Sequence, residues 1–150
     1  MTDAQLERIS PDAWLAGDFL GRAKLFAIDG ARDQLRTESR QVLLHNAVIA
    51  ACDALLAVKG YQVTGSDGGH RLRISKASEL LPDAHVELFE SLDDARVSRN
   101  DASYAAAPVP ALEIEDTVVD VRTLIGLVDR EVKPLLPEWR SGAEDDSGGH

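Results

Sequence analysis

Hydrophobic residues recur at helical spacing along most of the chain, and the clearest stripe lies toward its C-terminal end. Its six members are spaced 4-3-4-3-4, which predicts one amphipathic helix facing a core. They are Ile114, Val118, Val121, Ile125, Val128 and Val132. Leu124 and Leu127 broaden the stripe, either within one wide helix face or as a surface for a second subunit. Pro134 should end the helix.

Residues 42–58 are almost entirely apolar, which predicts a central helix buried on most sides and ended by Lys59 and Gly60. Three polar residues interrupt it: His45, Asn46 and Asp53. At about 100° per residue they share one sector of the helix surface. They either line a site or flank the solvent edge of the helix and satisfy one another.

A helix before this central one should begin at Ser10-Pro11-Asp12, with Ser10 as its N-cap, and run to about Ile28. Residues 1–9 before it are expected to form a short polar leader. Gly17 and Gly21 lie four residues apart on this helix. The pair indicates either a close approach to another helix or simple tolerance of glycine.

Residues 61–69 follow the central helix and are expected to form a flexible connection, since glycines permit tight turns. A short helix should then run to about Pro82, carrying a basic patch of His70, Arg71, Arg73 and Lys76. This patch either receives an anion or is a solvated face balanced by neighbouring carboxylates. A phosphate-cradling loop is not favoured, because no Gly-Lys-Ser/Thr sequence follows the glycines.

The next helix, opening at Pro82-Asp83, places an arginine in a position suited to the core. Leu88, Leu92, Ala95 and Arg99 follow the spacing of one buried face. A guanidinium stays charged and is costly to bury alone, so Arg99 should meet an acid, a carbonyl or a ligand. We expect Asp53 to be its partner.

These elements predict an all-α fold, a bundle of four to five helices spanning residues 1–140. Residues 141–150 are glycine-rich and acidic and should form a disordered tail. The 150-residue chain is large enough to bury a core without metals or disulfides. No Glu-x-x-His pair lies on a predicted helix, so a ferritin-like metal centre is not expected, and no cofactor is predicted.

The formal charge of −10 opposes broad attraction to nucleic acid, so any such contact must be local. Cys52, the single cysteine, excludes an intramolecular disulfide and should be a buried, inert thiol. We find no secretory leader, and we read no apolar run as long enough to cross a bilayer. A cytoplasmic protein without membrane contact is therefore expected.

Several stretches together resemble the HEPN superfamily, compact helical domains of prokaryotic toxin–antitoxin, defence and nucleotidyltransferase-associated systems. They are the alanine-rich helix at 44–56, the Gly68-Gly69-His70-Arg71 helix start, the run Arg96-Val97-Ser98-Arg99-Asn100-Asp101-Ala102-Ser103-Tyr104, and the long last helix. The likeness covers most of the chain and is closest to a small actinobacterial-type branch with an Arg-Asn-x-x-x-Tyr motif. It implies an antiparallel bundle, a homodimer, and a nucleotidyltransferase or antitoxin-like partner.

Members that cleave RNA carry an arginine, a polar residue directly after it, and a histidine four to six residues further on. Arg99 and Asn100 match the first half of this motif, but Tyr104 stands where the histidine would be. Metal-independent cleavage needs a proton acceptor and a donor, which imidazole supplies near neutral pH, whereas a tyrosine would need strong tuning. His45 or His70 could in principle replace the missing base, but a lone histidine in a bundle is more often a structural residue. Loss of nuclease activity is therefore the simpler interpretation.

The expected function is therefore binding of a nucleotide, RNA or partner protein around Arg96, Arg99, Asn100 and Tyr104. On one continuous helix Arg99 and Tyr104 point about 140° apart, whereas Arg96, Asn100 and Ser103 cluster within about 60°. One alternative is a metal-independent endoribonuclease toxin with a variant site. Another is a structural adaptor in which Arg99 forms a buried pair with Asp53.

Overall fold

The computed structural model describes residues 3–65, 68–81, 85–94 and 111–136, and this part of the chain is mostly helical. Its helices are α1 (Ala13–Gly30), α2 (Thr37–Lys59), α3 (Gly69–Leu80) and α5 (Ala111–Val132), with further helical residues at 86–94. A short 3-10 turn, η2 (Lys133–Leu135), follows α5. The prediction of a helical bundle is confirmed at this level, while the expected tail at 141–150 lies outside the described residues.

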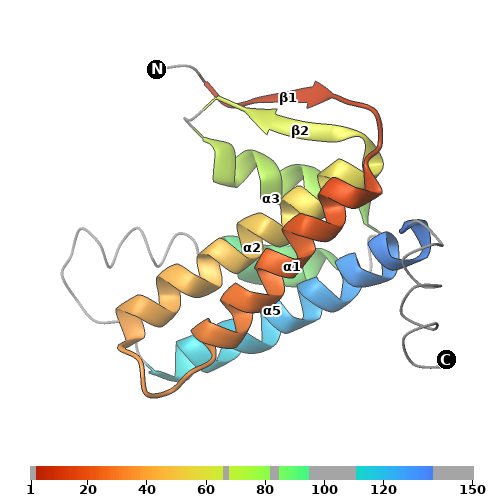
Figure 1. The fold of residues 1–150 in the computed structure, drawn as a ribbon. Coiled ribbons are helices and arrows are strands. Elements are labelled where there is room, and N and C mark those ends of the chain that lie inside the picture. Colours follow the sequence, from red (N-terminus) through yellow and green to blue (C-terminus); the bar gives the residue numbers. More distant parts are fainter. Residues whose placement is uncertain (1–2, 66–67, 82–84, 95–110, 137–150) are drawn as a thin grey trace, which may run out of the picture.

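The apolar helix α2 is the centre of the bundle, as its sequence predicts. It packs against α1, α3 and α5, and α5 also packs against α1 (Figure 1). Buried alanines are frequent on both α1 and α2. They include Ala16, Ala23 and Ala27 of α1 and Ala47 and Ala51 of α2. Small side chains therefore let these two helices lie close together.

Gly30, at the end of α1, lies close to Leu44 of α2. A Cβ atom at this position would lie 2.8 Å from the Leu44 side chain, so only glycine fits without a shift of the leucine. Gly21, by contrast, is exposed with open space around it. The interpretation of Gly21 as a point of close helix approach is therefore wrong.

The stripe on α5 is buried as predicted. All six of its residues, Ile114 to Val132, lie in the core, and so does Leu124, which is fully buried. Leu127 is partly buried and packs against the same core. Leu124 thus widens the helix face within one bundle and is not available to a second subunit.

Length and apolar composition alone would allow α2 to span a membrane, and it is the one such helix among the described residues. Our expectation that no apolar run reaches that length was therefore wrong. Most of the apolar stretch is buried against the other helices, which gives α2 the place of a core helix.

Two short strands were not predicted. Strand β1 (Gln5–Arg8) pairs antiparallel with β2 (Tyr61–Thr64), in a register that sets Gln5 opposite Thr64 and Arg8 opposite Tyr61. Gly60 turns the chain from α2 into β2 with a positive φ of 90°. Its carbonyl accepts a hydrogen bond from the Ile9 amide, 2.9 Å away. The polar leader and the flexible connection therefore form a ribbon packed beside α3 (Figure 1).

Two helix starts also differ from the prediction. Asp12, not Ser10, caps α1, because its Oδ1 accepts a hydrogen bond of 2.9 Å from the Leu15 amide. Helix α2 already begins at Thr37, within the charged stretch that precedes the apolar run at 42–58. Arg40 of this stretch is buried, and its side chain donates to the Gly30 carbonyl at 3.0 Å and to Glu115 at 2.7 Å.

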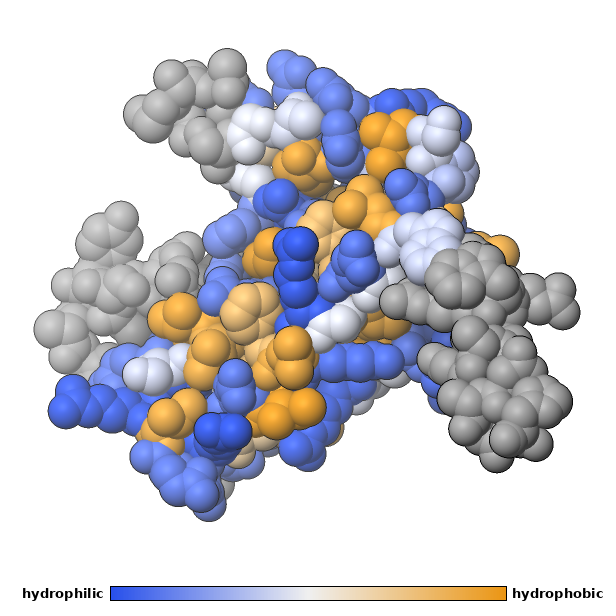
Figure 2. Space-filling view, viewed as in Figure 1, coloured by the Kyte–Doolittle hydropathy of each residue, from blue (hydrophilic) through white to orange (hydrophobic). Residues whose placement is uncertain are grey.

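One face of the molecule carries exposed apolar side chains. Figure 2 shows them gathered over α1 and α2, with charged side chains among them. Leu25 and Ile28 of α1 and Val42 of α2 are among the exposed large hydrophobic residues of these helices.

Candidate functional site

Two histidines from separate helices meet at the junction of α2 and α3. The Nε2 atom of His45 lies 2.7 Å from the Nδ1 atom of His70, and the ring centroids are 4.5 Å apart. His45 is buried and His70 is exposed, so the pair connects the interior of the bundle to solvent. A hydrogen bond between two imidazoles needs an N–H on one ring and a lone pair on the other.

An ion pair lies further along the same two helices. Asp53 Oδ1 accepts a hydrogen bond of 2.7 Å from Arg73 Nε, and both side chains are largely buried, at 17% and 19% exposed. Burial raises the pKa of Asp53, although the guanidinium of Arg73 opposes this shift. The charges of His70 and Arg22 also act to lower the pKa of Asp53, which places them in the electrostatic neighbourhood of the ion pair.

The basic patch predicted on α3 divides into paired and unpaired cations. Arg73 is held by Asp53, and Lys76 lies 3.2 Å from Glu79 and 4.7 Å from the centre of the Tyr61 ring. For Arg73 and Lys76, the interpretation of a helix face balanced by neighbouring carboxylates therefore holds. Arg71 is exposed and forms no ion pair with any residue that the structure describes.

Three of the four candidate residues in the described part of the chain thus come together: His45, Asp53 and His70. The fourth, Asn46, is partly exposed and makes no side-chain hydrogen bond within the described residues. The other five candidates lie outside the described residues. They are Arg96, Arg99, Asn100, Ser103 and Tyr104.

Asp53 was predicted to pair with Arg99, but its partner among the described residues is Arg73. Arg73 was noticed only as part of a basic patch, and Arg22 was not among the candidate residues. A pairing signal does exist in hindsight: one carboxylate lies inside the apolar helix, and the nearest cluster of cations follows it on the next helix. Which cation reaches the carboxylate depends on how α3 crosses α2, which the sequence pattern does not encode.

The chemistry open to this cluster is proton exchange and anion contact. Imidazole groups serve as proton donors and acceptors in many protein sites, and Arg71 offers a planar set of N–H donors suited to phosphate. No group of three His, Cys, Asp or Glu side chains in the described part of the chain is arranged to hold a metal ion. The chain matches no protein-family model, no curated protein and no solved structure.

Proposed function

We propose that this protein is an HEPN-like helical module that binds phosphate groups of RNA or of a nucleotide at the α2–α3 junction. The observation that carries the proposal is the 2.7 Å contact of His45 with His70, which holds an exposed imidazole near the start of α3. The exposed Arg71 is the next residue in the sequence of the same helix. Both groups donate hydrogen bonds to phosphate oxygens, and the guanidinium does so with a full charge.

The acidity of the chain limits where such binding takes place. A net charge of −10 repels a polyanion from most of the surface, so affinity depends on a local set of donors. Arg73 and Lys76 are already paired with carboxylates, whereas Arg71 forms no ion pair with any described residue and His70 is exposed at the start of α3. The HEPN resemblance implies that the motif residues Arg96, Arg99, Asn100 and Tyr104 also take part in binding.

Binding is tested with a fluorescein-labelled short single-stranded RNA and, separately, a fluorescent ATP analogue, both read by anisotropy at low salt. We expect Arg71→Gln and His70→Gln each to weaken binding about fivefold, the scale of one charge-assisted contact at an exposed position. Arg122→Gln is the matched control, because Arg122 is also exposed and has no ion pair among the described residues, but lies on α5. Equal weakening by Arg71→Gln and Arg122→Gln, or no binding by the unaltered chain, would overturn the proposal.

A metal-independent endoribonuclease is the second candidate, and the histidine pair is what favours it. RNA cleavage needs one group to accept the 2′-hydroxyl proton and another to protonate the leaving oxygen, and imidazoles serve both roles. Incubation with total RNA in the absence of divalent metal tests this candidate. Cleavage that disappears in His70→Gln, Arg99→Ala and Tyr104→Phe would establish it, and intact RNA with the unaltered chain would exclude it.

The assembly implied by the HEPN resemblance belongs to the same proposal. A homodimer with a nucleotidyltransferase or antitoxin-like partner in a toxin–antitoxin or defence system would bring two copies of the motif together. Exposed apolar residues on α1 and α2 support an interface on the face drawn in Figure 2. Light scattering coupled to size-exclusion chromatography measures the mass directly, and a monomer at all concentrations would count against the homodimer.

A further inference from the structure

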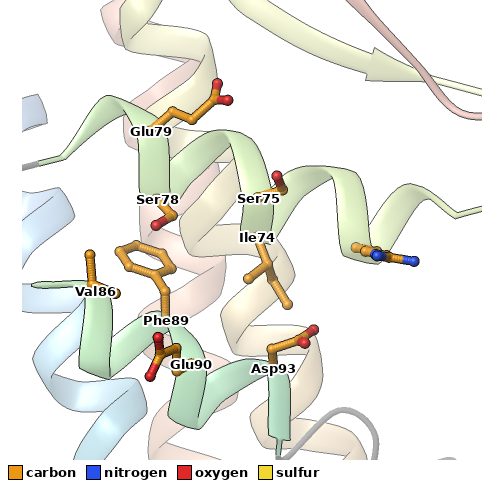
Figure 3. A pocket seen from close by; sticks show the side chains of 9 residues that line it. Ile74, Ser75, Ser78, Glu79, Val86, Phe89, Glu90 and Asp93 are labelled. Atoms are coloured by element: carbon orange, nitrogen blue, oxygen red, sulfur yellow. The ribbon is translucent and has the colours of Figure 1, made fainter. Parts of the chain in front are cut away.

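A pocket of about 370 Å³ lies between α3 and the helical residues 86–94. None of the side chains of the histidine pair or of the Asp53–Arg73 pair lines it. Figure 3 shows Ile74 and Phe89 facing each other across the pocket, with Val86 at one side. Ile74 and Phe89 are almost fully buried and form an apolar floor, while Val86 is 42% exposed. The volume falls in the range of sites that hold a small ligand or one large side chain.

The edge of the pocket is acidic. Figure 3 shows Glu79, Glu90 and Asp93 spread around it. Arg71 is the one cation among the described residues that line the pocket. Glu79 lies 3.2 Å from Lys76, whereas Glu90 forms no ion pair or hydrogen bond with any side chain in the described ranges. Ser75 and Ser78 add two hydroxyl groups to the lining. The surroundings therefore combine an apolar floor with a rim whose formal charge is negative.

We propose that this pocket receives a lysine or arginine side chain from a basic segment of a partner protein. The alkyl stem of such a side chain packs on Phe89 and Ile74, and its cationic head stays at the rim beside Glu90. An anionic group is repelled by the carboxylates of the rim, and a purely apolar side chain would leave Glu90 without a countercharge. The net charge of −10 over the whole chain further favours the approach of a basic partner.

The test uses a fluorescein-labelled short peptide of alternating arginine and alanine, and the same peptide with glutamate in place of arginine. Binding to the full chain is measured by anisotropy at two salt concentrations. Ser78→Leu fills the pocket without changing its charge and should weaken binding about tenfold, as expected when an anchoring side chain loses its pocket. Glu90→Gln removes one carboxylate and should weaken binding about threefold.

Controls separate this pocket from general acidity and from the proposed RNA site. Glu113→Gln removes an exposed carboxylate from the start of α5 and should leave peptide affinity unchanged. His70→Gln should also leave peptide affinity unchanged. The proposed RNA site and the proposed peptide pocket are therefore tested independently, and one can fail while the other holds. Should Ser78→Leu fail to fold, Glu90→Lys at an exposed position replaces it, with an expected loss of about tenfold. The proposal is overturned if the acidic peptide binds equally well, if Glu113→Gln weakens binding as much as Glu90→Gln, or if filling the pocket has no effect.

Discussion

The Nε2 atom of His45 and the Nδ1 atom of His70 lie 2.7 Å apart and join two helices through a contact between residues 25 positions apart. Helix α3 contributes few buried residues of its own, namely Gly69, Ile74 and Ala77. Polar contacts with α2 therefore have a large part in fixing its position. An intact His–His hydrogen bond leaves one ring nitrogen without a proton, so the pair carries at most one positive charge.

A double-mutant cycle measures the strength of this contact. We expect His45→Ala and His70→Ala to show a coupling of about 1 kcal/mol in the free energy of unfolding at neutral pH, the value of a typical hydrogen bond. Urea denaturation supplies each value. The pair His45→Ala and His85→Ala serves as the control, and the two changes in the free energy of unfolding should be additive. A His45–His70 coupling at neutral pH that is indistinguishable from that control would contradict the prediction.

Arg40 links three helices and should be important for stability. Its buried guanidinium donates to the Gly30 carbonyl at the end of α1 and to Glu115 on α5, at 3.0 Å and 2.7 Å. Arg40→Ala leaves both acceptors without this donor and should lower the free energy of unfolding by about 2–4 kcal/mol. Arg40→Lys should recover little of the loss, because an ammonium does not reproduce the two-sided guanidinium geometry.

The matched change at the other residue of the Arg40–Glu115 ion pair is Glu115→Gln. Glu115 is 56% exposed, so water replaces much of what the carboxylate loses, and the expected cost is only about 0–1 kcal/mol. Both variants are measured by urea denaturation with Arg122→Ala as a surface control. Equal costs for Arg40→Ala and Glu115→Gln would show that the contact with the Gly30 carbonyl contributes nothing.

The helices were predictable because their signal is long and periodic. The stripe from Ile114 to Val132 repeats over five intervals, and α2 carries an apolar run that only a core position accommodates. Each of these patterns extends over several helical turns, so a single polar residue within it does not hide the helical period. The end of α2 was equally well marked, since Gly60 adopts the left-handed conformation that glycine accommodates.

The ribbon and the polar contacts were not predictable in the same way. Strands β1 and β2 have four residues each, too few to show alternation, and they pair across more than 50 residues of sequence. His45 and Asp53 of the polar sector of α2 both make polar contacts with α3, but nothing in that sector specifies His70 or Arg73 as their partners. Those pairings depend on how α3 packs on α2, which tertiary structure alone determines.

Asp129 should make stability depend on pH in acid solution. Burial acts to raise the pKa of Asp129, but contacts with Lys24 and Lys133, at 3.0 Å and 3.5 Å, outweigh it and hold the pKa below its ordinary value. Because the folded-state pKa is lowered, the stabilisation is fully present above the ordinary aspartate pKa of about 4 and is lost as the pH falls through the folded-state value.

Asp129→Asn should therefore cost about 0.5 kcal/mol at neutral pH, the scale of a partly exposed ion pair, and progressively less as the solution is acidified. Urea denaturation of both proteins across this pH range gives the comparison. Asp116→Asn, at an exposed position of α5 without an ion pair in the described part of the chain, is the control. A cost that stays constant into strongly acid solution would mean that Asp129 acts through packing and not through its charge.

Cys52 should be almost unreactive in the folded protein. Burial, followed by the nearby charge of Asp53, raises the pKa of this thiol from 9.0 to about 12, and Arg73 offsets only part of the effect. The thiolate is the reactive form, so a rise of three units lowers its population about a thousandfold at neutral pH. Ellman's reagent should react with one thiol per chain in guanidinium chloride and only very slowly without it. Since Cys52 is the single cysteine, the whole signal reports this position, and equal rates in the folded and unfolded chain would contradict its burial in α2.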